Sequence, residues 1–196
     1  MNVVNDANGL ITLQPGAKAD ERVYYDSGSL VIDFTSDHND DGVVEGQGVN
    51  VDSRYQVGYF GKYDWMPPED KIYPPESAGS GDPYELPAFS ILNQDTIAHS
   101  ITIGYDFTSD PGGSEIFIMG SSRSADAVDS SSNIPKRSDW FPGGDGELVF
   151  KDYGDDGQPG DIRLKPGGRI GVSLFIDTTG GSTDDDLSGT LTVSSD

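Results

Sequence analysis

The sequence predicts an all-β fold: an antiparallel two-sheet sandwich, either jelly-roll or immunoglobulin-like, with long loop insertions in a single domain over residues 1–196. The first observation behind this prediction is the content of glycine and proline. The 26 glycines and 12 prolines spread through the chain leave hardly any window for a long amphipathic helix. The second observation is a series of short runs in which Ile, Val, Phe and Tyr alternate with polar residues, as in strands with one buried face. The topology stays open between the two types.

Eleven stretches carry the strand pattern. They are residues 10–13, 23–25, 29–34, 55–60, 88–92, 99–107, 115–119, 147–151, 162–164, 169–177 and 187–193. Residues 93–98 form a polar connection of hairpin length, so we expect the strands before and after it to pair antiparallel. Residues 165–168, with the sequence Lys-Pro-Gly-Gly, form a tight turn that leads into the strand at 169–177.

Two stretches interrupt this rhythm and are expected to be loop insertions. Residues 64–87 contain six prolines, and residues 120–146 are rich in serine and glycine. Both contain aromatic residues, which are Trp65, Tyr73, Tyr84, Trp140 and Phe141. Long loops with aromatic anchors commonly pack against the body of a domain, so we expect these insertions to do the same.

The charge points to a halophilic source. The chain has 27 Asp and 7 Glu against 12 Lys and Arg, a formal charge of −22 and a pI near 4.1. Molar salt shortens the Debye length to about 3 Å and relieves the self-repulsion of such a surface. An acidic calcium-loaded or disordered protein is the alternative interpretation. Nucleic acid and anionic membranes would be repelled, so we expect neither as a partner.

The chain contains no cysteine, which excludes disulfides and thiolate metal sites. No apolar run reaches the roughly 18 residues that a membrane-spanning helix needs, so we expect no membrane insertion. Residues 1–6 lack the basic and apolar stretches of a secretory signal. If the protein is exported, we therefore expect this sequence not to be its precursor.

The sharpest local motif is an acidic stretch at residues 37–45. Oxygen-bearing residues at relative positions one, three, five and nine, with Gly42 at six, match the first part of a calcium loop. The candidate ligands are Asp37, Asn39, Asp41 and Glu45. Gly48 stands where an EF-hand has its bidentate glutamate, so a partial loop or a solvated acidic turn are the two interpretations. Thinner candidates lie at 152–161 and 183–186, and calcium is the one cofactor that the sequence raises.

The sequence offers no reaction to assign, and we expect no enzyme. The two histidines, His38 and His99, stand in no pattern with a nucleophile or a metal partner. The chain contains no Gly-x-Ser-x-Gly elbow, phosphate-binding glycine loop or His-Glu-x-x-His motif. With 34 acidic residues, some carboxylate pair would lie at a catalytic separation by chance.

Three parts of the chain together resemble a known family. They are the opening at residues 2–10, the middle at 89–94 with 101–103, and the closing turn at 164–167 with 172–177. Over most of its length the chain resembles a haloarchaeal family of exported β-sandwich proteins of unknown function. This sandwich plan is similar to that of the TasA and camelysin proteins of bacterial biofilm matrices and of archaeal bundling pili. The resemblance implies polymerisation, in which an N-terminal strand of one subunit completes a sheet of the next.

We therefore expect a structural subunit of an extracellular or cell-surface filament, a pilus or matrix fibre of a halophilic archaeon. Its partners would be copies of itself, joined head to tail by a donor strand at residues 1–13 that lies beside residues 187–193. The expected interface residues are Val3, Val4, Leu10, Ile11, Leu13, Leu187, Leu191 and Val193. The N-terminal segment could equally pair within its own subunit. The alternative function is a monomeric secreted cell-surface module that binds carbohydrate or calcium.

Overall fold

The computed structural model describes residues 2–4, 11–16, 22–26, 29–32, 51–58, 84–123, 125–128, 146–149, 151–153, 159–161 and 163–195. These residues form strands and turns, and none of them is helical. The described part of the chain accordingly has no apolar helix long enough to span a bilayer. The prediction of an all-β protein is confirmed.

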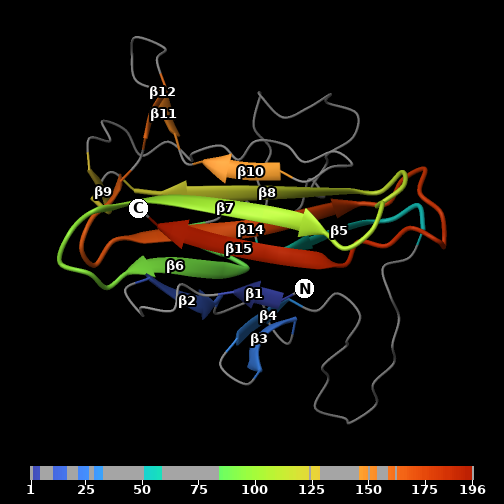
Figure 1. Cartoon of the computed structure of the whole chain (residues 1–196), viewed down its shortest axis with the longest axis horizontal. Coiled ribbons are helices and arrows are strands. Elements are labelled where there is room, and N and C mark those ends of the chain that lie inside the picture. Colours follow the sequence, from blue (N-terminus) through green and yellow to red (C-terminus); the bar gives the residue numbers. More distant parts are fainter. Residues whose placement is uncertain are drawn as a thin grey trace.

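Most strands belong to two sheets (Figure 1). The eight-stranded sheet runs in the order β3 (Val23–Asp26), β4 (Ser29–Ile32), β1 (Asn2–Val4), β15 (Gly189–Ser195), β7 (His99–Phe107), β13 (Arg163–Leu164) and β9 (Ala127–Val128), with β10 (Gly146–Val149) also on β7. The five-stranded sheet contains β2 (Ile11–Pro15), β6 (Phe89–Asn93), β14 (Arg169–Asp177), β5 (Arg54–Val57) and β8 (Glu115–Ser122). A separate pair joins β11 (Lys151–Tyr153) to β12 (Pro159–Asp161). All pairs are antiparallel except β1 with β15.

One long strand lies at the centre of each sheet. In the five-stranded sheet, β14 pairs with β8 from Ile170 to Asp177, while β6 and β5 share its other edge end to end. The two short strands meet at Ser173, where Gly58 leaves the sheet and Ala88 enters it. A side chain at Gly58 would come within 2.2 Å of the Ala88 nitrogen, and its φ of 73° also favours glycine. The chain therefore leaves and re-enters this sheet at neighbouring points along β14, and the expected Pro-rich insertion lies between these two points in the sequence.

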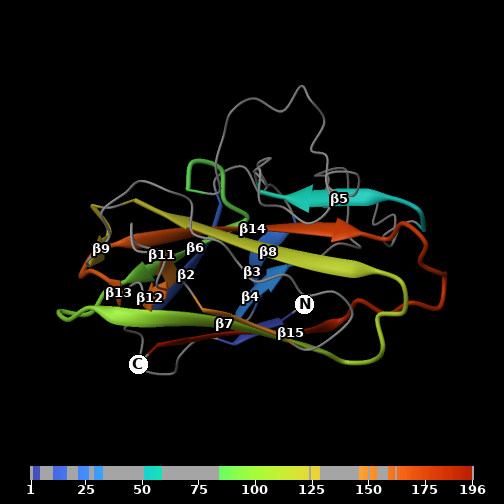
Figure 2. The ribbon, with the colours of Figure 1, turned by 90° about the horizontal axis from the view of Figure 1, so that it is seen from above.

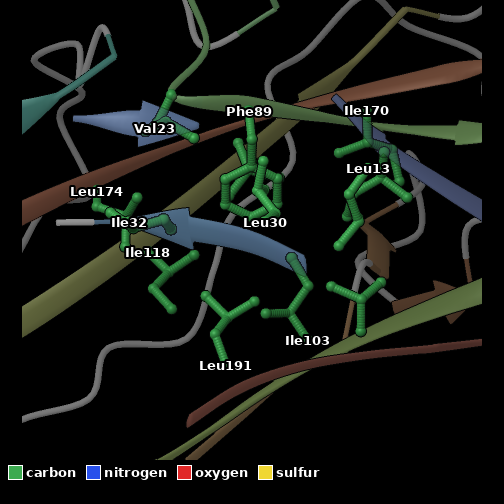
Figure 3. Packing of buried hydrophobic residues seen from close by; sticks show 14 of the residues in the cluster. Leu13, Val23, Leu30, Ile32, Phe89, Ile103, Ile118, Ile170, Leu174 and Leu191 are labelled. Carbon is green, nitrogen blue, oxygen red and sulfur yellow. The ribbon is translucent and has the colours of Figure 1, made fainter. Parts of the chain in front are cut away.

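The buried core takes side chains from both sheets. Ile103 and Leu191 come from the eight-stranded sheet, and Phe89, Ile118 and Leu174 come from the five-stranded sheet (Figure 3). All five side chains are fully buried. Burial of each such side chain contributes about 1.5–3 kcal/mol of transfer free energy, so this cluster stabilises the fold strongly.

The sequence located most strands but not all of their ends. The bounds predicted for β7 and β14 are confirmed, whereas β8 continues to Ser122, beyond the expected end at Met119. The single strand expected at 147–151 is divided between β10 and β11. The short strands β9 and β12 were not expected, and β1 was expected only as part of a donor strand over residues 1–13, because two or three residues are too few to show alternation. β9 lies within the expected serine-rich insertion.

Candidate functional site

The first candidate site is the position of β1 within the eight-stranded sheet. β1 lies between β4 and β15, and it is the only link between the β3–β4 hairpin and the rest of this sheet among the described strands. Two residues pair with the hairpin: Asn2 and Val3 lie opposite Val31 and Leu30 of β4. On its other edge β1 runs parallel to β15. The continuity of the sheet thus depends on one short strand at the N-terminus. We call the position between β4 and β15 the β1 slot, whichever strand fills it.

The register of the β1 slot places Val3 between two core positions. Val3 pairs with Leu30 on β4 and with Leu191 on β15, and these two leucines are 2 % and 0 % exposed. An apolar residue is what this position requires, because residues directly opposite one another in a sheet share a face. At the neighbouring position Asn2 pairs with Thr190, which is exposed. The alternation of the slot therefore matches Asn2 and Val3, whereas Val4 pairs with Thr192.

The other expected interface residues are distributed over the core. Ile11 and Leu13 are buried in β2, which pairs with β6 in the other sheet, so the expected donor segment 1–13 contributes to two sheets. Leu191 and Val193 are buried in β15, and Leu187 packs against the same cluster. Val4 lies in β1, and Leu10 lies outside the described residues. β1 pairs with β15 of the same chain, so in this structure the N-terminal segment pairs within its own subunit, as the alternative to strand donation expected.

The expected calcium ligands Asp37, Asn39, Asp41 and Glu45 all lie outside the described residues. Within the described part, no three His, Cys, Asp or Glu side chains gather as a metal site would require. The acidic run at 183–186, which was a weaker candidate for a cation, is described, and its carboxylates Asp185 and Asp186 accept hydrogen bonds from the protein.

Asp185 joins two loops at one end of the molecule. Its carboxylate accepts hydrogen bonds from the hydroxyls of Ser114 at 2.8 Å and Ser182 at 2.9 Å, and from the Gly113 backbone N–H at 3.1 Å. These bonds, that from Ser114 above all, lower the pKa of Asp185. We call the segments 51–53, 108–114 and 178–188 the loop end; in Figures 1 and 2 it is the end reached by the loops that follow β7 and β14.

Two further contacts hold the loop end. The Gly180 N–H donates to the Asp52 carboxylate at 3.0 Å, and the Ser109 hydroxyl donates to Asp186 at 2.7 Å. The bond from Ser109 is the main cause of a lowered pKa at Asp186. Carboxylates here serve as structural acceptors for loop N–H and hydroxyl groups.

At the start of β15, Tyr105 and Gly189 fit together closely. The buried Tyr105 hydroxyl donates to the Leu187 carbonyl at 2.7 Å, and its ring meets the Phe107 ring edge to face at 4.7 Å. Burial raises the pKa of Tyr105 well above its usual value. A side chain at Gly189 would lie 2.5 Å from the hydroxyl and ring carbon of Tyr105, so glycine is needed for this packing.

At the opposite end, Asn93 holds the β6–β7 turn. Its fully buried amide donates to the carbonyls of Ile97 and Leu164, both at 2.8 Å, while its Oδ1 accepts the Asp95 N–H at 2.9 Å. His99 Nε2 lies 2.7 Å from an Asp95 carboxylate oxygen, and this hydrogen bond is the main cause of a lowered pKa at Asp95. We call the segments 93–99, 125–128 and 163–169 the turn end.

Next to the turn end, Tyr84 lies between two arginines. The guanidinium carbons of Arg169 and Arg123 are 4.1 Å and 4.6 Å from the centre of its ring, a cation–π arrangement. Arg169 also donates to the Tyr84 carbonyl at 2.8 Å, and Arg123 pairs with Glu85. Burial and a hydrogen bond with Asp126 raise the pKa of Tyr84. These contacts attach the returning end of the Pro-rich insertion to β14 and to Arg123, the residue after β8, as the aromatic content of the insertion predicted for Tyr84.

Sequence reasoning missed the roles of Asn93, Asp185 and Gly189. The position of Asn93 at the boundary between a strand and a turn was a usable signal, because asparagine side chains there often bond to the backbone two residues on. The roles of Asp185 and Gly189 depend on contacts with segments distant in sequence, so no local sequence pattern predicts them. No family model, no curated protein and no solved structure matches the chain.

Proposed function

We propose that this chain is a structural subunit of an extracellular filament of a halophilic archaeon and that it assembles by strand exchange at the β1 slot. In the filament, the slot between β4 and β15 of each subunit receives the N-terminal strand of the neighbouring subunit. The role is structural and not catalytic. The acidic composition and the resemblance to exported haloarchaeal β-sandwich proteins support the habitat and the location.

The proposal depends on one observation: a three-residue N-terminal strand joins two parts of a sheet and runs parallel to the C-terminal strand. A parallel strand cannot be reached from its neighbour by a hairpin, so its backbone is held in place mainly by the two edges that flank it. The same edges accept an identical strand from another copy equally well, because main-chain hydrogen bonds and alternate side chains decide the fit. In the proposed filament the exchange runs head to tail and does not close on itself, so it generates a fibre.

We further infer that the two larger sheets pack face to face as a sandwich. The common core supports this arrangement, since Leu30 and Leu191 flank the β1 slot and belong to the same buried cluster as Phe89 and Leu174. A strand entering the slot therefore adds its apolar side to a core that already exists. That burial supplies a driving force for assembly that strengthens in molar salt.

Fibre formation by the variant Val3→Asp in high salt tests the proposal. A carboxylate between Leu30 and Leu191 would be buried without a partner, so we expect no fibres by negative-stain electron microscopy. Asn2→Asp is the matched control, because it adds the same charge beside the exposed Thr190, and it should still form fibres. Regular fibres of Val3→Asp would overturn strand exchange.

A mixing experiment separates exchange between subunits from pairing within one chain. A Val3→Asp subunit can receive a strand from a wild-type neighbour but cannot donate one, so it ends a growing fibre. Adding a small fraction of this variant to wild-type protein should shorten the fibres markedly. Unchanged fibre length would assign the strand to its own chain. Dispersed wild-type particles under all salt conditions would favour the monomeric secreted module for carbohydrate or calcium.

A further inference from the structure

The turn end presents an exposed apolar side chain on a fixed support. Ile97, in the β6–β7 turn, is 60 % exposed, and Tyr25 at 52 % is the only other large hydrophobic residue with such exposure among those whose side chains the structure describes. The turn itself is held by the buried Asn93 amide, which binds the Ile97 carbonyl directly. An apolar group that is already ordered loses little conformational entropy on binding, which is the property of an interface anchor.

Basic residues gather around this turn. The turn end contains Arg163, Lys165 and Arg169, three of the twelve basic residues of the chain, together with only Asp95 and Asp126 as acids. Backbone hydrogen bonds bring these segments together, since the Lys165 N–H donates to the Asp126 carbonyl at 2.8 Å and the Gly167 N–H to the Asn93 carbonyl at 2.8 Å. On a chain with a formal charge of −22, these three segments carry three basic residues against two acidic ones.

The loop end has the opposite character and lies at the other extreme of the long axis (Figure 1). It contains five aspartates and neither lysine nor arginine; the aspartates are Asp52, Asp110, Asp184, Asp185 and Asp186. Hydrogen bonds from the protein fix several of these carboxylates, as described above, so their positions are ordered. Two copies of so acidic a chain repel each other, and among the described segments the turn end against the loop end is a pairing that brings opposite charges together.

We propose that copies of this chain dock end to end, the turn end of one against the loop end of the next, with Ile97 as the apolar anchor and Arg163 and Lys165 facing the aspartates of the second copy. This inference deepens the proposed filament, on which it rests, by naming a second contact along the fibre. Molar salt screens charges beyond about 3 Å, so only ion pairs in direct contact contribute there, while salt strengthens the contact of the isoleucine.

Site-specific cross-linking of the full chain tests the docking. The chain has no cysteine, so single cysteines can be placed at will. Thr96→Cys marks the turn end and Thr183→Cys marks the loop end; both positions are exposed. A short bis-maleimide added to a mixture of the two variants should give cross-linked dimers about tenfold above either variant alone. Ser29→Cys, exposed on β4, mixed with Thr96→Cys is the control and should stay at the lower yield.

Two further substitutions test the chemistry of the contact. Ile97→Ser should lower the cross-linked yield about tenfold, whereas Gln94→Ser, at an exposed position of the same turn, should leave it unchanged. Arg163→Glu with Lys165→Glu should also abolish the cross-link, and Asp184→Lys with Asp186→Lys in the second copy should restore it. Restoration requires that the two ends meet, because neither set of changes repairs the fold of the other.

Equal yields from all cysteine pairs, or yields indifferent to Ile97 and to the charges, would overturn end-to-end docking. The outcome is separable from that of strand exchange. Fibres shortened by Val3→Asp together with equal cross-linking would remove the docking and keep the filament. Preferential cross-linking together with no effect of Val3→Asp would keep the docking and remove strand exchange.

Discussion

At both the turn end and the loop end, one polar side chain holds the loops by hydrogen bonds, but the chemical type of that side chain differs. At the turn end, a fully buried neutral amide, Asn93, satisfies two carbonyls and one N–H. At the loop end, the carboxylate of Asp185 on the surface accepts two hydroxyls and one N–H. The amide can donate and accept, whereas the carboxylate only accepts and carries a charge. Stability contributed by the Asn93 amide should therefore be insensitive to acid, and that contributed by the Asp185 carboxylate should be lost in acid.

The largest effect is expected when the turn end is broken. Asn93→Ala removes three hydrogen bonds and leaves the buried Leu164 carbonyl without the Asn93 donor, so we expect a loss of about 3 kcal/mol in the free energy of unfolding. Urea unfolding at fixed high salt measures it. Gln94→Ala, exposed and next in sequence, should change stability by less than about 0.5 kcal/mol. Equal losses for the two variants would show that the amide does not hold the turn.

A smaller effect is expected from a steric change beside the loop end. Gly189→Ala places a methyl group 2.5 Å from the Tyr105 hydroxyl and from the Asp106 carbonyl oxygen, so we expect a loss of about 2 kcal/mol. Gly104→Ala is the matched control on the neighbouring strand, because a methyl group there meets nothing within 4 Å. Thermal unfolding of both variants measures the difference. A Gly189→Ala protein as stable as Gly104→Ala would mean that Tyr105 moves aside freely.

The sequence predicted the strands in which apolar and polar residues alternate over enough positions to show a period. Alternation located β7 and β14 because each spans nine residues with one or both faces buried. It could not locate β1, since three residues carry no period and only the edges of β4 and β15 define the strand. The register that brings Val3 opposite Leu30 and Leu191 joins positions near the two ends of the chain, so it is a property of the tertiary structure.

The candidate sites likewise combine features that the sequence predicted with features that only the tertiary structure shows. The N-terminal segment was recognised as a partner of the last strand, but its division between two sheets was not, because both Val3 and Ile11 have the apolar character that either sheet accepts. The acidic run at 183–186 was interpreted only as a weak candidate for a cation site. One of its carboxylates, Asp185, bonds to Ser114, which is 71 residues away. The composition gives the number of aspartates, whereas the structural role of Asp185 follows only from this contact.

The smallest effect is expected in the acid sensitivity of the loop end, which tests the difference between the two ends. The pKa of Asp185 is lower in the folded chain than its ordinary value of 3.8, so the ionised form is favoured by folding. Its contribution is present above the unfolded pKa and is lost as the pH falls through the folded one. Asp185→Asn keeps an acceptor for Ser114 but removes the charge, so its melting temperature should fall less than that of the wild type when the pH is lowered from about 5 to about 2.

Asp184→Asn is the control for this measurement, because it removes one charge from the same loop at a carboxylate for which the described residues provide no hydrogen bond. Its melting temperature should follow the wild-type dependence on pH. Asp95 and Asp186 also have lowered pKa values and contribute to the acid loss in every variant, so the difference between the curves of Asp185→Asn and the wild type isolates one carboxylate. Parallel curves for all three proteins would mean that the charge of Asp185 does not stabilise the loops, and the contrast between the two ends would then lie in burial alone.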